Sequence, residues 1–400
     1  MTKPVLLYYC RHTDGMGGLA RTLTIAKQLT DRFRVVILNG GLCPAGANVP
    51  VDIGFIQLPP LTASADSGAA RAALQNELQS RRDMILEHYE QLRPHVLLFE
   101  TFPFGQKKIA DELMPLLEKA RHVTSTRPLI ICSVKDILPG NGFDKQERAD
   151  RITALLEEYF DAIIVHSDPL FARLEEYYQP RKPLATPVYH SGFVVRDRDP
   201  LQRIAGREKR ILVAAGGGID GGTLIRAAAE AHRLLWGVAQ LPMTIVASPD
   251  FPKQEWESLE RTARDLPGLE LKRSVPDLGA EFAKVCWVVS HCGYDAAVDV
   301  LATGVSALLL PGGNDESGQA DRLQRMQSWR AARSLMPRHL NGASLANSIY
   351  QLIKFEPAVT DFNLDGAEIT ANIIYELAQS GDVRPISLSA ENLTGRPRFH

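Results

Sequence analysis

Short apolar runs alternate with longer amphipathic runs along most of the chain. In the first half, the apolar runs predict strands at Val5–Cys10, Val35–Leu38, Ile53–Leu58, Val96–Glu100, Leu129–Cys132 and Ala162–His166. The amphipathic runs predict helices at Leu19–Leu29, where apolar residues recur on one face, and at about Ala69–Leu92. This alternation is typical of parallel α/β layers.

The pattern restarts in the second half. It predicts strands at Arg210–Ala215, Met243–Ala247, Leu269–Lys272, Trp287–Ser290 and Ser306–Leu310. It predicts helices at Thr223–Gly237, Lys253–Asp265, Tyr294–Thr303, Gln319–Ser334 and Ala343–Phe355. The charged stretch Arg196–Pro200 between the halves has the composition of an exposed linker, so we expect the boundary near residues 195–208.

The two series of elements predict two Rossmann-like domains, at residues 1–197 and 206–358. A last predicted helix at about Gly366–Gln379, within residues 359–381, is a candidate to pack back on the first domain. Prolines and polar residues from Asp382 onward predict a poorly ordered tail at 382–400.

Composition narrows the class of protein. With 400 residues, 45% apolar and 23% charged, the chain resembles a soluble protein of two or three domains. A net charge of -2 gives no electrostatic footprint for nucleic acid. No apolar run reaches the length of a membrane span, and the five scattered cysteines favour a reducing compartment. We expect a cytoplasmic protein whose membrane contact, if any, is peripheral.

Each half opens with a strand, a glycine-rich turn and a helix, at Cys10–Arg21 and at Val213–Thr223. Glycines allow close backbone approach to a ligand, and a helix N-terminus attracts anions. The second turn contains G-x-G-x-x-G, at Gly216, Gly218 and Gly221. That motif also fits an NAD-binding domain, although the next strand lacks the expected terminal acidic residue, since Asp250 comes late. A tight turn without a ligand is a further alternative.

The most informative stretch runs from Val288 to Leu323, and predicts a strand, glycine turn, helix, strand, polar glycine-rich loop and helix. Two successive strand ends thus present loops at one sheet edge, where ligands bind in open α/β sheets. The segment Ser290–Tyr294, with Asp299 and the later Pro311–Arg322, resembles the donor-binding signature of MurG-like inverting glycosyltransferases. The resemblance, shared with uncharacterised predicted glycosyl transferases, covers most of residues 4–355 and is more specific in the second half.

The resemblance implies a GT-B fold, in which two Rossmann-like domains have parallel sheets facing a central cleft. It implies metal-independent, inverting transfer of a sugar from a UDP-linked donor to a hydroxyl acceptor, with no cofactor. Asp299 stands where the family has a glutamate that binds the ribose. The donor-binding residues that the resemblance implies are Gly216, Gly217, Gly218, Gly221, Gly222, Val275, His291, Gly293, Tyr294, Asp299, Asp315, Glu316, Gln319 and Arg322.

The N-terminal turn departs from the family, because Gly18 stands where relatives often carry a histidine near the acceptor. The acceptor-side loop comprises Gly15, Gly17, Gly18 and Arg21. An inverting transfer needs a general base near the attacking hydroxyl. The candidates at predicted strand ends are Asp14, the first choice, together with His12 and Glu100. Asp14 can instead be a turn or cap residue.

Other interpretations remain open. A UDP-sugar hydrolase, an epimerase-like enzyme acting on UDP-HexNAc, or a nucleotide-sugar-binding protein without transfer activity fits the same fold. Asp197 and Asp199 form a D-x-D, a metal-binding motif elsewhere, but their position in the linker favours a solvated role, and we expect no metal. His291 can be a structural histidine at a strand end. His166, His190 and His232 have no partner pattern and are expected to be structural.

Overall fold

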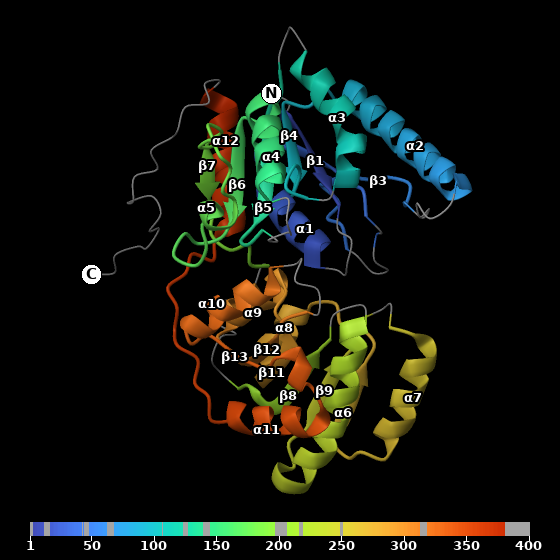
Figure 1. The fold of residues 1–400 in the computed structure, drawn as a ribbon, viewed down its shortest axis with the longest axis vertical. Helices are drawn as coiled ribbons and strands as arrows, with labels where there is room; N and C mark the ends of the chain where they lie inside the picture. The colour runs from blue at the N-terminus through green and yellow to red at the C-terminus, as the bar shows by residue number, and fades with distance from the viewer. Residues whose placement is uncertain are drawn as a thin grey trace.

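Two parallel sheets, each flanked by helices, make up the computed structural model (Figure 1). The structure describes residues 3–11, 17–41, 43, 48–61, 68–105, 107–122, 127–138, 145–196, 206–215, 219–248, 251–312 and 318–380. The two sheets lie in separate halves that stack one above the other in Figure 1.

The N-terminal sheet has seven parallel strands in the order β3-β2-β1-β4-β5-β6-β7. Their bounds are β1 Val5–Cys10, β2 Arg34–Asn39, β3 Gly54–Gln57, β4 Val96–Glu100, β5 Leu129–Lys135, β6 Ala162–His166 and β7 Val188–His190. The chain leaves β1 for β2 on one side and later returns to β4 on the other. The end of β1 is therefore a topological switch point.

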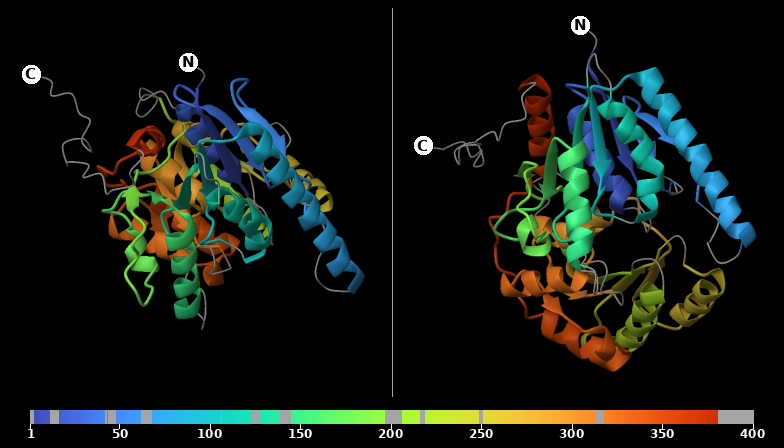
Figure 2. Two further views of the ribbon diagram at one scale, coloured as in Figure 1. Left: turned by 90° about the horizontal axis from the view of Figure 1, so that it is seen from above. Right: turned by 45° about the horizontal axis from the view of Figure 1, so that its top comes forward.

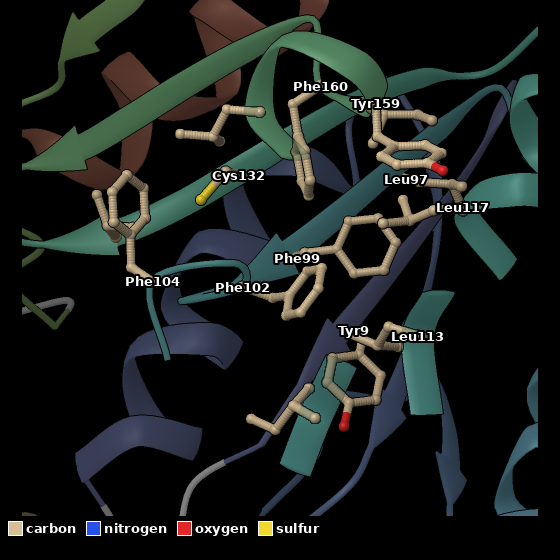
Figure 3. Close-up of a cluster of buried hydrophobic side chains, with 14 of the residues drawn as sticks. Tyr9, Leu97, Phe99, Phe102, Phe104, Leu113, Leu117, Cys132, Tyr159 and Phe160 are labelled. Atoms are coloured by element: carbon tan, nitrogen blue, oxygen red, sulfur yellow. The ribbon is translucent and has the colours of Figure 1, made fainter. Parts of the chain in front are cut away.

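Helices cover both faces of this sheet because successive side chains of each strand point to opposite faces. Leu7, Phe99 and Cys132 face a core shared with α2, α3 and α4, seen close up in Figure 3. Leu6 and Leu98 face the opposite core, which α1 covers. The helices of this half are α1 Gly17–Leu29, α2 Gly68–Leu92, α3 Lys107–Arg121, α4 Lys145–Tyr159 and the short α5 Leu174–Tyr177.

The C-terminal sheet repeats the plan with six parallel strands in the order β10-β9-β8-β11-β12-β13. The strands are β8 Glu208–Ala214, β9 Met243–Val246, β10 Leu269–Lys272, β11 Val285–His291, β12 Ser306–Leu310 and β13 Arg333–Ser334. The helices are α6 Ile219–Ala239, α7 Lys253–Arg264, α8 Leu278–Lys284, α9 Tyr294–Thr303, α10 Gln319–Ser328 and α11 Gly342–Leu352. Here the switch point lies between β8 and β11.

The last helix, α12 (Gly366–Ser380), returns from the second half to the first (Figures 1 and 2). There it packs against α1. Its apolar face, including Ile373, Ile374 and Leu377, joins the core that α1 covers. The Arg32 guanidinium lies 4.7 Å from the centre of the Tyr375 ring. The chain therefore passes between the halves twice.

The bounds of the core strands agree closely with the sequence prediction. The ends of some helices and strands differ from it, and some short strands were not predicted. The predicted helix Gln319–Ser334 is wrong in its second half, because α10 ends at Ser328 and Arg333–Ser334 is an edge strand. Arg330 has a positive φ of 53°, which the helix cannot continue through. The predicted strand Leu129–Cys132 extends to Lys135. Neither β7 nor β13 was predicted.

Truncation of Ile374 tests the docking of α12. Ile374 is fully buried, so Ile374→Ala removes apolar contacts and leaves a cavity. We expect the free energy of unfolding, measured by urea denaturation, to fall by about 2–5 kcal/mol. Glu376→Ala, on the exposed side of the same helix, is the control. Equal stability of the two variants would show that α12 contributes little to the fold.

Candidate functional site

A buried ion pair lies at the switch point of the N-terminal sheet. Arg21, on α1, donates from Nη2 to Oε1 of Glu100, the last residue of β4. Both side chains are almost completely buried. Burial by itself lowers the pKa of Arg21, but the negative charge of Glu100 raises it, and the net effect is a raised pKa. The other oxygen of Glu100, Oε2, is buried, and no residue in the described part of the chain donates a hydrogen bond to it. A buried acceptor without a hydrogen bond usually costs about 1–3 kcal/mol.

Arg21 also connects the two halves. Its Nη1 lies 3.4 Å from Oδ1 of Asp295, in the first turn of α9, and its guanidinium lies 5.1 Å from the centre of the Tyr294 ring. Because α9 follows β11, Asp295 belongs to the switch point of the C-terminal sheet. The switch points of the two sheets therefore face each other.

Tyr294 fixes this arrangement from the C-terminal half. Its ring is 3% exposed, and its hydroxyl donates to the carbonyl of His166 at 2.9 Å while accepting from the Val194 amide at 3.2 Å. His166 is buried between the hydroxyls of Ser133 and Ser191, at 2.7 and 3.0 Å from its ring nitrogens. Burial, assisted by the charge of Arg21, lowers the pKa of His166 to about 3, so the ring is neutral at physiological pH.

A second buried ion pair crosses the interface. Arg322, on α10, donates to both carboxylate oxygens of Asp136 at 2.7 Å, and to the carbonyl of Cys292 at 3.0 Å. Both side chains of the pair are at most 2% exposed. One turn further along α10, Arg325 donates to the Tyr177 hydroxyl at 2.6 Å and pairs with Glu176. The helix α10 is therefore attached to the N-terminal half through two arginines.

The structure places several predicted donor residues at the edge formed by β8, β11 and β12. Gly221 and Gly222 lie in the first turn of α6 rather than in a loop, because this helix begins at Ile219. Gly293 is the N-cap of α9, and Oε1 of Gln319 accepts from the Gly312 amide at 2.8 Å. Asp299 is 3% exposed within α9.

Other residues of the predicted site lie away from that edge, make contacts with the N-terminal half, or belong to a helix where a loop was predicted. Val275 lies partly buried after β10, against the core of the C-terminal half. Tyr294 and Arg322 direct their polar groups to the N-terminal half. His291 ends β11. Gly17, Gly18 and Arg21 belong to α1 and not to a loop. His12, Asp14, Gly15, Gly216, Gly217, Gly218, Asp315 and Glu316 lie outside the described residues.

Sequence reasoning missed Lys135 and Asp136 at the end of β5. The predicted strand stopped at Cys132, so these residues were not recognised as lying at a strand end. Alternation could have found them, because Ile131, Ser133 and Lys135 continue the same period of two. Over the described ranges, no group of three or more metal-binding side chains gathers. None of the helices that the structure describes has the length and apolar character of a membrane span.

No protein-family model matches the chain, and neither does any curated protein sequence. Solved structures do. MurG from Acinetobacter baumannii superposes with a TM-score of 0.57 at 14% identity, covering 93% of this chain and 100% of MurG. A UDP-glucosyltransferase from Polygonum tinctorium superposes with a TM-score of 0.59 at 15% identity, covering 95% of this chain and 99% of that enzyme. The UDP-N-acetylglucosamine 2-epimerase from Rickettsia bellii superposes with a TM-score of 0.55 at 11% identity, covering 95% of this chain and 97% of the epimerase.

These superpositions extend over both sheets. The chain has the GT-B fold. Identities this low show the architecture alone. The GT-B prediction from the sequence is thus confirmed, with two all-parallel sheets whose switch points meet.

The Asp136–Arg322 pair gives a direct test of how the halves of this GT-B chain are held together. Asp136→Asn and Arg322→Met each leave a buried charge unpaired, and each should lower the free energy of unfolding by about 3–5 kcal/mol. The double variant should lose less than the sum of the two. Additive losses would mean that the side chains do not interact. Arg151→Met, which removes an exposed pair with Glu147, is the control and should change little.

Proposed function

We propose that this protein is a glycosyltransferase that moves a sugar from a UDP-linked donor to a hydroxyl acceptor, with inversion at the anomeric carbon and without a metal. The observation that carries the proposal is the meeting of the two switch points through Arg21, Glu100 and Asp295. Ligands of open parallel sheets bind at such points. A donor at one point and an acceptor at the other would therefore lie in contact.

The donor side of the proposal rests on the C-terminal half. The N-terminus of α6 follows β8 at the switch point, and its free amides and dipole favour a diphosphate there. A carboxylate suits ribose hydroxyls, which is the role we propose for Asp299. The structural neighbours include a UDP-glucosyltransferase and a plant enzyme in complex with UDP-2-fluoro-glucose, in agreement with a UDP-sugar donor.

The acceptor side rests on Glu100. We propose that Oε2 of Glu100 takes the proton of the acceptor hydroxyl. At the same time the hydroxyl oxygen bonds to the anomeric carbon of the donor sugar, and the bond from that carbon to the diphosphate breaks. Glu100 offers Oε2 because Arg21 occupies Oε1. Binding of a hydroxyl would also satisfy this buried acceptor, to which none of the described residues donates. Arg21 would position the carboxylate.

An epimerase is the second candidate, favoured by the Rickettsia bellii 2-epimerase, whose TM-score of 0.55 is close to that of MurG. Incubation with UDP-N-acetylglucosamine alone distinguishes the two activities. A transferase leaves the configuration at C2 of the sugar unchanged in the absence of an acceptor. Appearance of the C2 epimer, followed by NMR, would favour the epimerase.

Nucleotide binding provides the first test of the proposal. In calorimetric titrations with UDP, GDP, ADP, TDP and NAD, we expect UDP or TDP to bind selectively. Asp299→Asn should weaken that binding by about tenfold or more, through loss of a charged hydrogen bond. Asp265→Asn, on the exposed end of α7, is the control. Binding of NAD alone, or of no nucleotide, would contradict the proposal.

Glu100→Gln tests the proposed base. The amide keeps the shape of the side chain but does not accept the proton, so kcat should fall by about 10²–10⁴. Turnover is measured as UDP release from a panel of UDP-sugars with hydroxyl acceptors. UDP affinity should be unchanged, and Glu90→Gln on the exposed face of α2 should behave as wild type. Full turnover by Glu100→Gln would remove Glu100 from the mechanism.

A further inference from the structure

Lys135 ends β5 beside the two buried ion pairs of the interface. Its backbone is in register with His166 of β6, and Ser133, two residues earlier, is in register with Glu100 of β4. Alternation along the strands places Lys135 and Glu100 on the face of the sheet that α1 covers, the face of Arg21. Lys135 is therefore a cation at the carboxyl edge, near the switch point.

The residues that follow Lys135 contact the C-terminal half. Asp136 pairs with Arg322, whose guanidinium also binds the carbonyl of Cys292, in the glycine turn after β11. The side chain of Ile137 lies against Gly318, so closely that a methyl group at Gly318 would come within 2.8 Å of it. The end of β5 therefore lies against both segments that the sequence assigns to donor binding, the turn after β11 and the start of α10.

Lys135 differs from the neighbouring arginines, because the described residues provide no counter-ion for it. Arg21 pairs with Glu100 and Asp295, and Arg322 pairs with Asp136. Among the described residues, no carboxylate comes within ion-pair distance of the Lys135 ammonium. Burial, with Arg21 and Arg322 nearby, lowers the pKa of Lys135 despite the attraction of Asp295 and Glu100. Lys135 is thus a partly buried cation whose charge no carboxylate of the described residues neutralises.

We infer that the Lys135 ammonium binds a phosphate of the nucleoside diphosphate, so that the N-terminal half contributes a cationic contact to the donor site. This inference rests on the proposed function for the identity of the ligand. A phosphate is a strong acceptor, and lysine binds it as a point charge. Negative charge grows on the leaving diphosphate as the glycosidic bond breaks, and a nearby cation stabilises that charge.

A merely structural role for Lys135 makes a different prediction about stability. An uncompensated, partly buried charge opposes folding, because water no longer solvates it fully. Lys135→Met keeps the length of the side chain without the charge, so its melting temperature should equal or exceed that of wild type. A structural ion pair would instead make this variant less stable.

The experiment compares UDP with uridine, which lacks the phosphates. We expect Lys135→Met to weaken UDP binding by about tenfold or more, through loss of one charged hydrogen bond, and to leave uridine binding unchanged. Lys135→Arg should recover part of the UDP affinity. Lys119→Met, which removes an exposed lysine on α3, is the matched control and should bind UDP as wild type does.

The outcomes separate the inference from the proposed function. If wild type binds UDP and Lys135→Met binds it equally well, the inference is overturned and the proposed function stands. A wild-type protein that binds no UDP contradicts the proposed function, and inorganic pyrophosphate then tests Lys135 alone. Pyrophosphate binding that is lost in Lys135→Met would support the phosphate contact, and binding that is absent or unaffected by the substitution would overturn it.

Discussion

The contact between the carboxyl edges of two parallel sheets is the constraint on which the rest of this structure depends. Arg322 and Asp136 bury opposite charges in that contact, and neither has another charged partner in the described part of the chain. A buried charge without its partner is strongly unfavourable, so this arrangement is stable only with the halves together. Tyr294, donating to the carbonyl of His166, adds a contact that needs the same alignment.

This constraint determines where chemistry can occur. In each sheet the strand order reverses beside the central strand, and both reversals lie at the contact. Within the described ranges, Oε2 of Glu100 has no hydrogen-bond donor and the ammonium of Lys135 has no counter-ion, and the two groups complement each other chemically. We propose that Glu100 accepts a hydroxyl proton and that Lys135 binds an anion. A transfer from a phosphate ester to a hydroxyl needs both functions close together.

The sequence predicted the architecture well, because buried parallel strands are continuous apolar runs whose limits are easy to read. Val5–Cys10, Val96–Glu100 and Ser306–Leu310 have the predicted bounds. Short edge elements were missed, since β7 and β13 carry too few residues for a periodic signal. Helix starts were also placed late, as for α6, because glycines read as a turn can belong to the first helical turn.

The site was predictable only in part, for a physical reason. The strand-end position of Glu100 made it a candidate base, and the family resemblance assigned the turn after β11, Tyr294 and Arg322 to the donor site. Their contacts to His166 and Asp136 join residues 128 and 186 positions apart, and no local pattern encodes such pairs. Lys135 carries no motif at all. Its proposed role depends on the lack of a counter-ion among the described residues, which only the assembled fold reveals.

We propose that the ligand binds where the two switch points meet, and a crystal structure with UDP bound would show whether it does. We expect the diphosphate to lie at the N-terminus of α6, with one phosphate in contact with the Lys135 ammonium. The nucleoside should lie on the C-terminal sheet. UDP bound at an outer face of either sheet, or at the C-terminal half with Lys135 still without a partner, would contradict this proposal.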